Sequence, residues 1–464
     1  MGPFYSGKNG YVLGIFLLLQ ASSLFAQTKT YSLLNLINSA ENYLPVLMQK
    51  KAIVAAAQST ITDTKHSFLP QLKFGEQLNI GSANSVAGSF FTFGMTPSTS
   101  GSIRGENNAQ PVTGNVAVLY SEYELDNFGL NGAKLNSAKA YVNLATADLK
   151  KETYFIDLNV AKLYLNILKT QYRAGADQQN IDRYISIYSV ILALTLSGIK
   201  AGSDSSLAKA ELSKTKISYN QTLGVFGQLK EQLSYLTGIP ARLLELDSLA
   251  INSLANKPVA ANLPLDTVNN PLIDYYVKRK DILLANQSLI KKSYLPKILL
   301  ASSVWARGSA IQYNDQYKSL ADGLGYQRYN YAAGLAFTYN LFNGIYKKDK
   351  LAVNRYQLQA SEFELQQQKL ALNSATLQAD NTLHTTRMNL TELPVQLHAA
   401  EDTYQQKLAQ YKAGLISLID LTNASFVLYR SQTDYIETLN DWYQAQLDKA
   451  ASTGNLTQFI QTLK

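Results

Sequence analysis

The residue types that usually carry catalysis are scarce in this chain and are not arranged as catalytic or metal sites. Its three histidines, His66, His384 and His398, lack the spacing of metal ligands, and the chain has no cysteine. The Gly-x-Ser-x-Gly elbow and the Gly-Lys-Ser/Thr phosphate loop are both absent from the sequence. We therefore expect no enzymatic activity, no catalytic residue, no metal and no cofactor.

The net charge of +8 arises from 42 basic and 34 acidic residues that are mixed along the chain. The basic residues form no arginine-rich stripe interleaved with aromatic side chains, the pattern typical of nucleic-acid-binding proteins. The sequence therefore predicts no nucleic-acid partner.

Residues 1–26 are typical of a secretory signal peptide. Lys8 supplies a positive charge, an apolar run extends from Tyr11 to Leu19, and Ala26 precedes the expected cleavage site. The mature chain should therefore leave the cytoplasm. Because it has no cysteine, we expect neither disulfides nor a lipid anchor.

The mature chain contains no run of about 20 apolar residues, the length that a membrane-spanning helix requires. If the chain enters a membrane, it must do so as a closed β-barrel, in which every backbone polar group is paired. Its 30 tyrosines, against two tryptophans, suit a membrane interface because tyrosine has an apolar body and a polar tip. Ordinary packing between helices is the alternative explanation for many of them.

An internal duplication organises the chain. Pro45 and Pro70 are 25 residues apart, and so are Pro271 and Pro296 in the second half. The interval within each pair has a helical pattern, which the later proline ends. We expect four parts, namely a signal peptide, a first repeat, a linker and a second repeat, at residues 1–26, 27–238, 239–268 and 269–464.

Each repeat contains two predicted strands, at about residues 71–82 and 112–124 in the first and 297–307 and 329–341 in the second. In the last of these, the odd positions from Tyr329 are mostly large and apolar, and the even positions are small or polar. A strand with lipid on one side and water on the other has this pattern. A half-buried strand of a soluble sheet has it too, and this strand alone does not decide between them.

A helical stretch of close to 70 residues follows each strand pair, over about 125–197 and 341–411. Uninterrupted, such a helix would be roughly 100 Å long; Pro394 should kink or interrupt the second one. Each stretch ends in a Lys-Ala-Gly turn, whose glycine, Gly202 or Gly414, fits the left-handed conformation that closes a helix. A returning helix follows each turn.

The expected elements require partners. Two strands per repeat give four per chain, whereas about eight is the smallest number that closes a barrel. The long helices are too long to fold back on a globular core and need lateral contacts. The chain should therefore assemble with copies of itself, and three copies would supply twelve strands.

This order of elements resembles the TolC-like family of outer-membrane efflux proteins over about residues 31–458. The resemblance rests on Ser-Phe/Tyr-Leu-Pro before the first strand of each pair, on Leu-Phe-Asn-Gly at 341–344, and on the Tyr-x-x-Gly-x5-Asp pattern that begins at Tyr411. No single motif is specific, but their order and spacing are.

The resemblance implies a mixed α and β membrane protein. It would be a homotrimer with a 12-stranded β-barrel in outer-membrane lipid, four strands per protomer, continued by a long α-helical barrel across the periplasm. Such a trimer is a passive exit duct for efflux or secretion. It docks on a periplasmic adaptor protein and an inner-membrane transporter. The alternative is a non-channel periplasmic coiled-coil scaffold or adhesin-like assembly, which shares the long helices but does not need the alternating strands.

The resemblance also places the pore constriction at the second helix turn. The family's constriction residue, six after the turn glycine, is Asp420 here, and Asn423 stands where many members have a second aspartate. Three copies of Asp420 would form a carboxylate ring that attracts cations. The segment from Ser417 to Asp420 also fits a capping box, and the two roles can coexist.

The two turns differ when both are aligned on their Lys-Ala-Gly motifs. The position equivalent to Asp420 is then Ala208, with Asp204 as the nearby acid, so we expect the acidic gate residue in the second repeat only. Ile416 also replaces a latch arginine of some members.

Residues at the tips of the two turns are candidates for docking the adaptor. They are Gly202, Gly414 and Tyr411. Helix capping is the alternative role of the two glycines.

Overall fold

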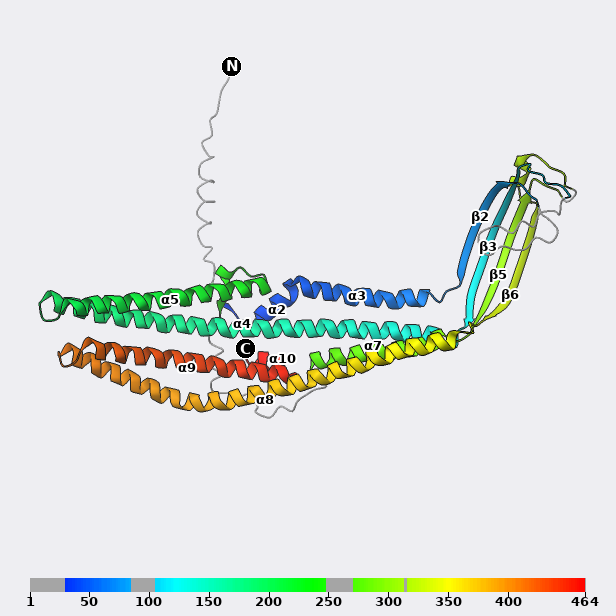
Figure 1. The fold of residues 1–464 in the computed structure, drawn as a ribbon. Coiled ribbons are helices and arrows are strands. Elements are labelled where there is room, and N and C mark those ends of the chain that lie inside the picture. Colours follow the sequence, from blue (N-terminus) through cyan, green and yellow to red (C-terminus); the bar gives the residue numbers. More distant parts are fainter. Residues whose placement is uncertain (1–29, 85–104, 248–269, 313–314, 464) are drawn as a thin grey trace, which may run out of the picture. The chain divides into compact units, whose positions relative to one another are not determined.

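The computed structural model describes residues 30–84, 105–247, 270–312 and 315–463 (Figure 1). The expected signal peptide and most of the expected linker lie outside these residues. The chain divides into two compact units. The sheet unit comprises Ile53–Ala145 and Lys278–Phe363, and the helical unit comprises the remainder. Each unit draws segments from both sequence repeats.

The sheet unit contains four antiparallel strands in the order β2-β3-β5-β6. Their bounds are Gln71–Gly81, Val112–Asp126, Lys297–Ser309 and Arg328–Thr338. The last strand ends three residues before the expected position 341. The Asn340 side chain accepts a hydrogen bond from the Phe342 amide at 2.9 Å and begins the turn into the next helix. The Asp126 side chain accepts from the Phe128 amide at 2.8 Å in the same way after β3.

The helices that precede the two strand pairs begin alike. They are α3 (Pro45–His66) and α7 (Pro271–Ser293). Each starts on its proline, a position at which the missing N–H costs no helical hydrogen bond. The duplicated prolines therefore define where both helices begin.

Each strand pair leads into one uninterrupted helix. These helices are α4 (Leu130–Leu196), with 67 residues, and α8 (Asn343–Lys412), with 70. Pro394 lies inside α8 without interrupting it. A proline removes one backbone donor, and the neighbouring Leu393 is buried, so packing holds the helix together there.

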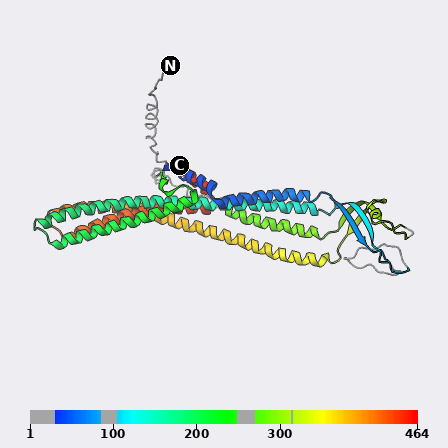
Figure 2. The same cartoon turned by 90° about the horizontal axis from the view of Figure 1, so that it is seen from above.

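The helical unit contains the returning helices α5 (Gly202–Thr237) and α9 (Leu418–Ser452). Both views place the α4–α5 and α8–α9 turns at the same end of this unit (Figures 1 and 2). Short elements complete it: α2 (Leu33–Tyr43), α10 (Leu456–Thr462), the 3-10 turn η1 (Ala241–Leu243) and the parallel pair β1 (Thr30–Tyr31) and β4 (Glu245–Leu246).

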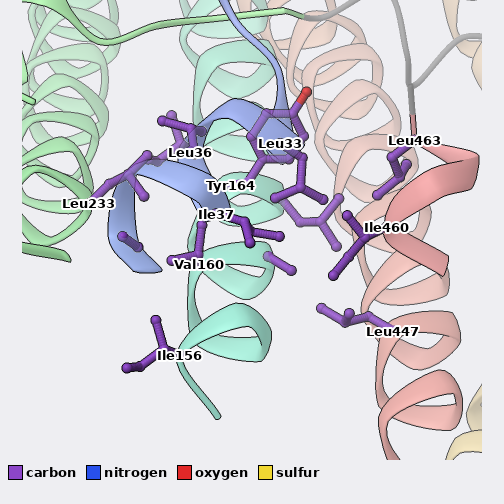
Figure 3. Packing of buried hydrophobic residues seen from close by; sticks show 14 of the residues in the cluster. Leu33, Leu36, Ile37, Ile156, Val160, Tyr164, Leu233, Leu447, Ile460 and Leu463 are labelled. Atoms are coloured by element: carbon purple, nitrogen blue, oxygen red, sulfur yellow. The ribbon is translucent and has the colours of Figure 1, made fainter. Parts of the chain in front are cut away.

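The larger core of the helical unit forms around α2 (Figure 3). Leu33, Leu36 and Ile37 of α2 pack against side chains from α4, α5, α9 and α10, and all of them are buried. Tyr164 of α4 is fully buried among them and donates a hydrogen bond to the Asp247 carbonyl at 2.6 Å. Each fully buried side chain of this kind contributes about 1.5–3 kcal/mol, so this cluster fixes the returning helices α5 and α9 against the long helix α4.

Candidate functional site: two helix turns and an amphipathic sheet

The second helix turn is closed by Gly414. Its φ is +76°, in the left-handed region that glycine adopts without strain. The Leu415 amide donates to the Gln410 carbonyl at 3.0 Å, and the Gly414 amide donates to the Tyr411 carbonyl at 3.0 Å. Gly414 therefore closes α8, as the sequence predicts.

Asp420 forms a capping box with Ser417 at the start of α9. The Asp420 amide donates to Ser417 Oγ at 3.3 Å, and Asp420 Oδ2 accepts from the Ser417 amide at 3.1 Å and from Ser417 Oγ at 2.7 Å. The hydrogen bond from the Ser417 side chain lowers the pKa of the Asp420 carboxyl, so Asp420 is ionised at neutral pH. Asp420 is exposed, and so is Asn423, which lies about one helical turn further along α9.

The first turn corrects the alignment of the two repeats. Gly198, with φ +75°, occupies the left-handed position, and Gly202 is instead the first residue of α5. The Ile199 amide donates to the Leu194 carbonyl at 2.9 Å, the same hydrogen bond that follows Gly414. The expectation that Gly202 closes the helix is wrong, because the backbone reverses four residues earlier.

Alignment on Gly198 changes the expected difference between the turns. Six residues beyond Gly198 stands Asp204, as Asp420 stands six beyond Gly414. Ala208 corresponds instead to Ala424, and both alanines are buried. The expectation that only the second repeat has an acid at this place is therefore wrong, and both turns carry one.

Tyr411 lies inside the bundle at this end. Its side chain is 1% exposed and belongs to a cluster that joins α4, α5, α8 and α9. Lys200 Nζ of the first turn lies 5.5 Å from the centre of its ring. Burial, together with the charge of Asp204, raises the pKa of the Tyr411 hydroxyl. Tyr411 therefore packs the two turns together, and within one chain its side chain is not on the surface, whereas Gly202 and Gly414 are exposed.

A buried carboxylate that the sequence did not reveal connects three helices further along. Asp177 of α4 is 1% exposed and accepts hydrogen bonds from Thr222 of α5 and Tyr429 of α9. These partners are 45 and 252 residues away in the chain, so sequence spacing contains no signal for them.

The sheet has one apolar face. The strand register places Phe74, Leu119, Val304 and Tyr331 in one row across all four strands, with exposed fractions of 72%, 43%, 57% and 86%. The pairs Leu300–Leu335 and Ile298–Phe337 lie on the same face. In β2, Leu72, Phe74, Leu78 and Ile80 lie on this face, and Glu76 is the one break in the alternation. Glu76 accepts a hydrogen bond from the Tyr326 hydroxyl at 2.7 Å.

Small and polar side chains predominate on the opposite face, which also carries the pair Val118 and Trp305. One of its rows consists of Lys73, Tyr120, Ser303 and Ala332, and another ends in Arg307 and Arg328. The alternation predicted for β2 and β6 thus places the apolar side chains of both strands on the same face of the sheet. Within the described residues, β2 and β6 each pair on one side only, so both edges of the sheet are open.

Neither a membrane-spanning helix nor a metal-ligand cluster is present among the described residues. No described helix is long and apolar enough to cross a membrane. No three or more described His, Asp or Glu side chains cluster as metal ligands.

Comparisons with solved structures show the fold. The chain is similar to the outer-membrane channel OprN, with 18% identity and a TM-score of 0.72 over 91% of this chain and 90% of that one. It is similar to CusC, with 15% identity and a TM-score of 0.76 over 92% of each chain. It is also similar to the outer membrane protein VceC from Vibrio cholerae, with 14% identity and a TM-score of 0.72 over 91% and 96%.

Sequence comparison supplies the family. Comparison with curated proteins gives no significant match. The family model described as "Outer membrane efflux protein" matches residues 36–238 and 281–455, well over half of the chain and nearly all of both repeats. The chain therefore belongs to the outer membrane efflux protein family.

Proposed function

We propose that three copies of this chain form a passive exit channel across the outer membrane and the periplasm. The observation that carries the proposal is the sheet, with one apolar face, one polar face and two open edges. Transfer of large apolar side chains from water to lipid lowers the free energy, so the side chains exposed in a single chain favour contact with lipid. The small and polar side chains that predominate on the opposite face suit a water-filled interior.

The open edges give the reason for assembly. An unpaired edge strand exposes a row of backbone N–H and C=O groups that have no hydrogen-bond partner within the sheet. Pairing β2 of one copy with β6 of the next satisfies both edges, and three copies then close a 12-stranded barrel. A periplasmic scaffold or adhesin-like assembly has no use for such a sheet, so the channel is the better explanation.

The acidic turns are the proposed entrance. In a trimer, three Asp420 carboxylates would face a shared axis with Asn423 one helical turn beyond, and Asp204 would add three more negative charges nearby. Like charges held close together attract cations to the opening. Gly202 and Gly414, at the exposed turns, are the proposed contacts for a periplasmic adaptor that joins the channel to an inner-membrane transporter. Tyr411 supports these turns from inside.

The test is the assembly and conductance of the full-length protein. Outer-membrane extracts should contain a trimer that dissociates on heating, and the purified trimer should form cation-preferring channels in planar bilayers. A soluble periplasmic monomer would overturn the proposal. If the trimer and its channels are found, cross-linking in whole cells would identify the adaptor and the transporter, and the transporter selects what is exported.

A further inference from the structure

A basic groove lies between α7 and α8 in the sheet unit, close to where the strands end. Its volume is about 500 Å³. Gln287 and Lys291 of α7 form one side, and Lys347, Lys348, Leu351 and Arg355 of α8 form the other. The α8 residues recur at intervals of three and four, so they share one face of that helix.

The charge in this groove is not compensated. No carboxylate lines it, and in the described part of the chain Lys291, Lys347 and Lys348 form no ion pair. Asp349 is the only carboxylate of α8 between Asn343 and Ser361, and it does not line the groove. Four like charges in one groove repel each other, so an anion bound between them would be strongly favoured.

The groove exists before anything binds. Asn343 Nδ2 donates to the Tyr294 carbonyl at 3.1 Å, and Asn354 Nδ2 donates to the Leu283 carbonyl at 3.1 Å. These hydrogen bonds hold α8 to α7 and to the turn that follows it. The Arg355 guanidinium lies 5.0 Å from the centre of the Tyr356 ring, which restrains its position. A ligand would therefore meet preformed walls.

The neighbouring residues indicate which anion the groove receives. Leu341, Phe342 and Ile345 are exposed by 85%, 63% and 59% and continue the apolar character of the β6 face. Lys347 and Lys348 follow after Tyr346, so apolar surface changes to basic surface within one helical turn. A phospholipid has the same order, acyl chains and then a phosphate.

We propose that this groove binds the phosphate of an anionic phospholipid headgroup in the membrane leaflet that faces the periplasm. The inference rests on the proposed function, because it needs the sheet to be inserted in lipid. The lysines and Arg355 would hold the phosphate, while the exposed apolar residues before them lie against the acyl chains. Bound lipid would thereby set the depth of the barrel in the membrane.

The test compares lipid binding by the purified wild-type trimer and two variants. In detergent, the trimer is titrated with phosphatidylglycerol, with zwitterionic phosphatidylcholine and with inorganic phosphate, and bound lipid is counted by native mass spectrometry. Each cation near an anionic headgroup contributes a factor of about five, so the double variant Lys347→Gln/Lys348→Gln should bind phosphatidylglycerol about 25-fold more weakly. The matched control, Lys350→Gln/Lys369→Gln, removes two charges from the same helix outside the groove and should bind like the wild type.

The outcomes separate the alternatives. A conducting wild-type trimer without preference for phosphatidylglycerol overturns the lipid site alone. Equal loss in the control overturns it too, as does full competition by inorganic phosphate at matched concentration, which indicates a site for free anions. Loss of the trimer in the groove variant, but not in Lys347→Arg/Lys348→Arg, would show that the groove is a contact between copies and would overturn the lipid site. A wild-type protein that forms no membrane trimer overturns the proposed function itself, and this site with it.

Discussion

Replacing Leu335 by arginine tests whether the apolar face of the sheet contacts lipid. Leu335 is 71% exposed and lies opposite Leu300 in the register of β5 and β6. Complete removal of a leucine side chain from water contributes about 2 kcal/mol, so lipid contact at this exposure contributes about 1.5 kcal/mol. An arginine on the lipid face costs about 2–4 kcal/mol near the middle of the membrane. Each copy should therefore lose about 3.5–5.5 kcal/mol, and three copies together more than about 10 kcal/mol, enough to prevent assembly.

The matched control is Ala336→Arg. Ala336 is the next residue of the same strand and points to the polar face, where it pairs with Leu299. An arginine there would meet water in the channel interior. The measurement is the fraction of heat-dissociable trimer in outer-membrane extracts at equal expression. Equal amounts of trimer from both variants would show that the two faces do not differ in environment and would refute the lipid-facing sheet.

Three further changes test the turns and a buried carboxyl. Gly414→Ala should lower the stability to thermal unfolding by about 1 kcal/mol because φ is +76° there, whereas Gly202→Ala, in the first turn of α5, should have almost no effect; equal effects would contradict the assignment of the turn. Asp420→Ala should weaken cation selectivity in planar bilayers, while Ser417→Ala, which breaks the same capping box but keeps the carboxylate, should preserve it; unchanged selectivity in Asp420→Ala would exclude the carboxylate ring. Burial, and then the charge of Glu41, raise the pKa of Asp157 to about 7, so its ionisation should reduce stability progressively as pH rises from about 4 to 7. Asp157→Asn should therefore melt at a higher temperature than the wild type at pH 8 and at the same temperature at pH 4, and a pH-independent difference would contradict this.

The strands and long helices were predictable because their signals are local. The alternation from Tyr329 is contained in one segment, and Pro45 and Pro271 define the beginnings of two helices. Such signals need no knowledge of distant contacts. The sheet register then brought the alternations of β2 and β6 and the less regular patterns of β3 and β5 onto one apolar face. The sequence indicated that face clearly for β2 and β6 only.

Elements that depend on distant contacts were not predictable. The helix α2 and the β1–β4 pair are held by packing around Tyr164 and by its hydrogen bond to the Asp247 carbonyl, 83 residues away. Asp177 likewise finds its partners on two other helices. The periodicity of one segment does not predict which distant residues it will contact.

The turn glycine was misassigned for a related reason. A Lys-Ala-Gly motif occurs at both turns, but the sign of φ, not the letters, identifies the residue that reverses the chain. Only the structure distinguishes Gly198 from Gly202, four residues apart. That shift of four residues also concealed Asp204 as the counterpart of Asp420.

With the corrected alignment, the two turns differ in helix capping and not in the presence of an acid. Both turns have a left-handed glycine and an acid six residues later, but the N-cap residue is Ser417 in the second and Ala201 in the first. Ala201 has no hydroxyl, and an N-cap of this kind costs about 1 kcal/mol relative to serine. Asp204 therefore has no N-cap hydroxyl to pair with, whereas Asp420 is paired with Ser417. The charge of Asp204 instead contributes to the raised pKa of the buried Tyr411 on the other hairpin. The α4–α5 hairpin begins its return with the weaker cap, so any opening of the proposed entrance should meet less local resistance there than at the α8–α9 hairpin.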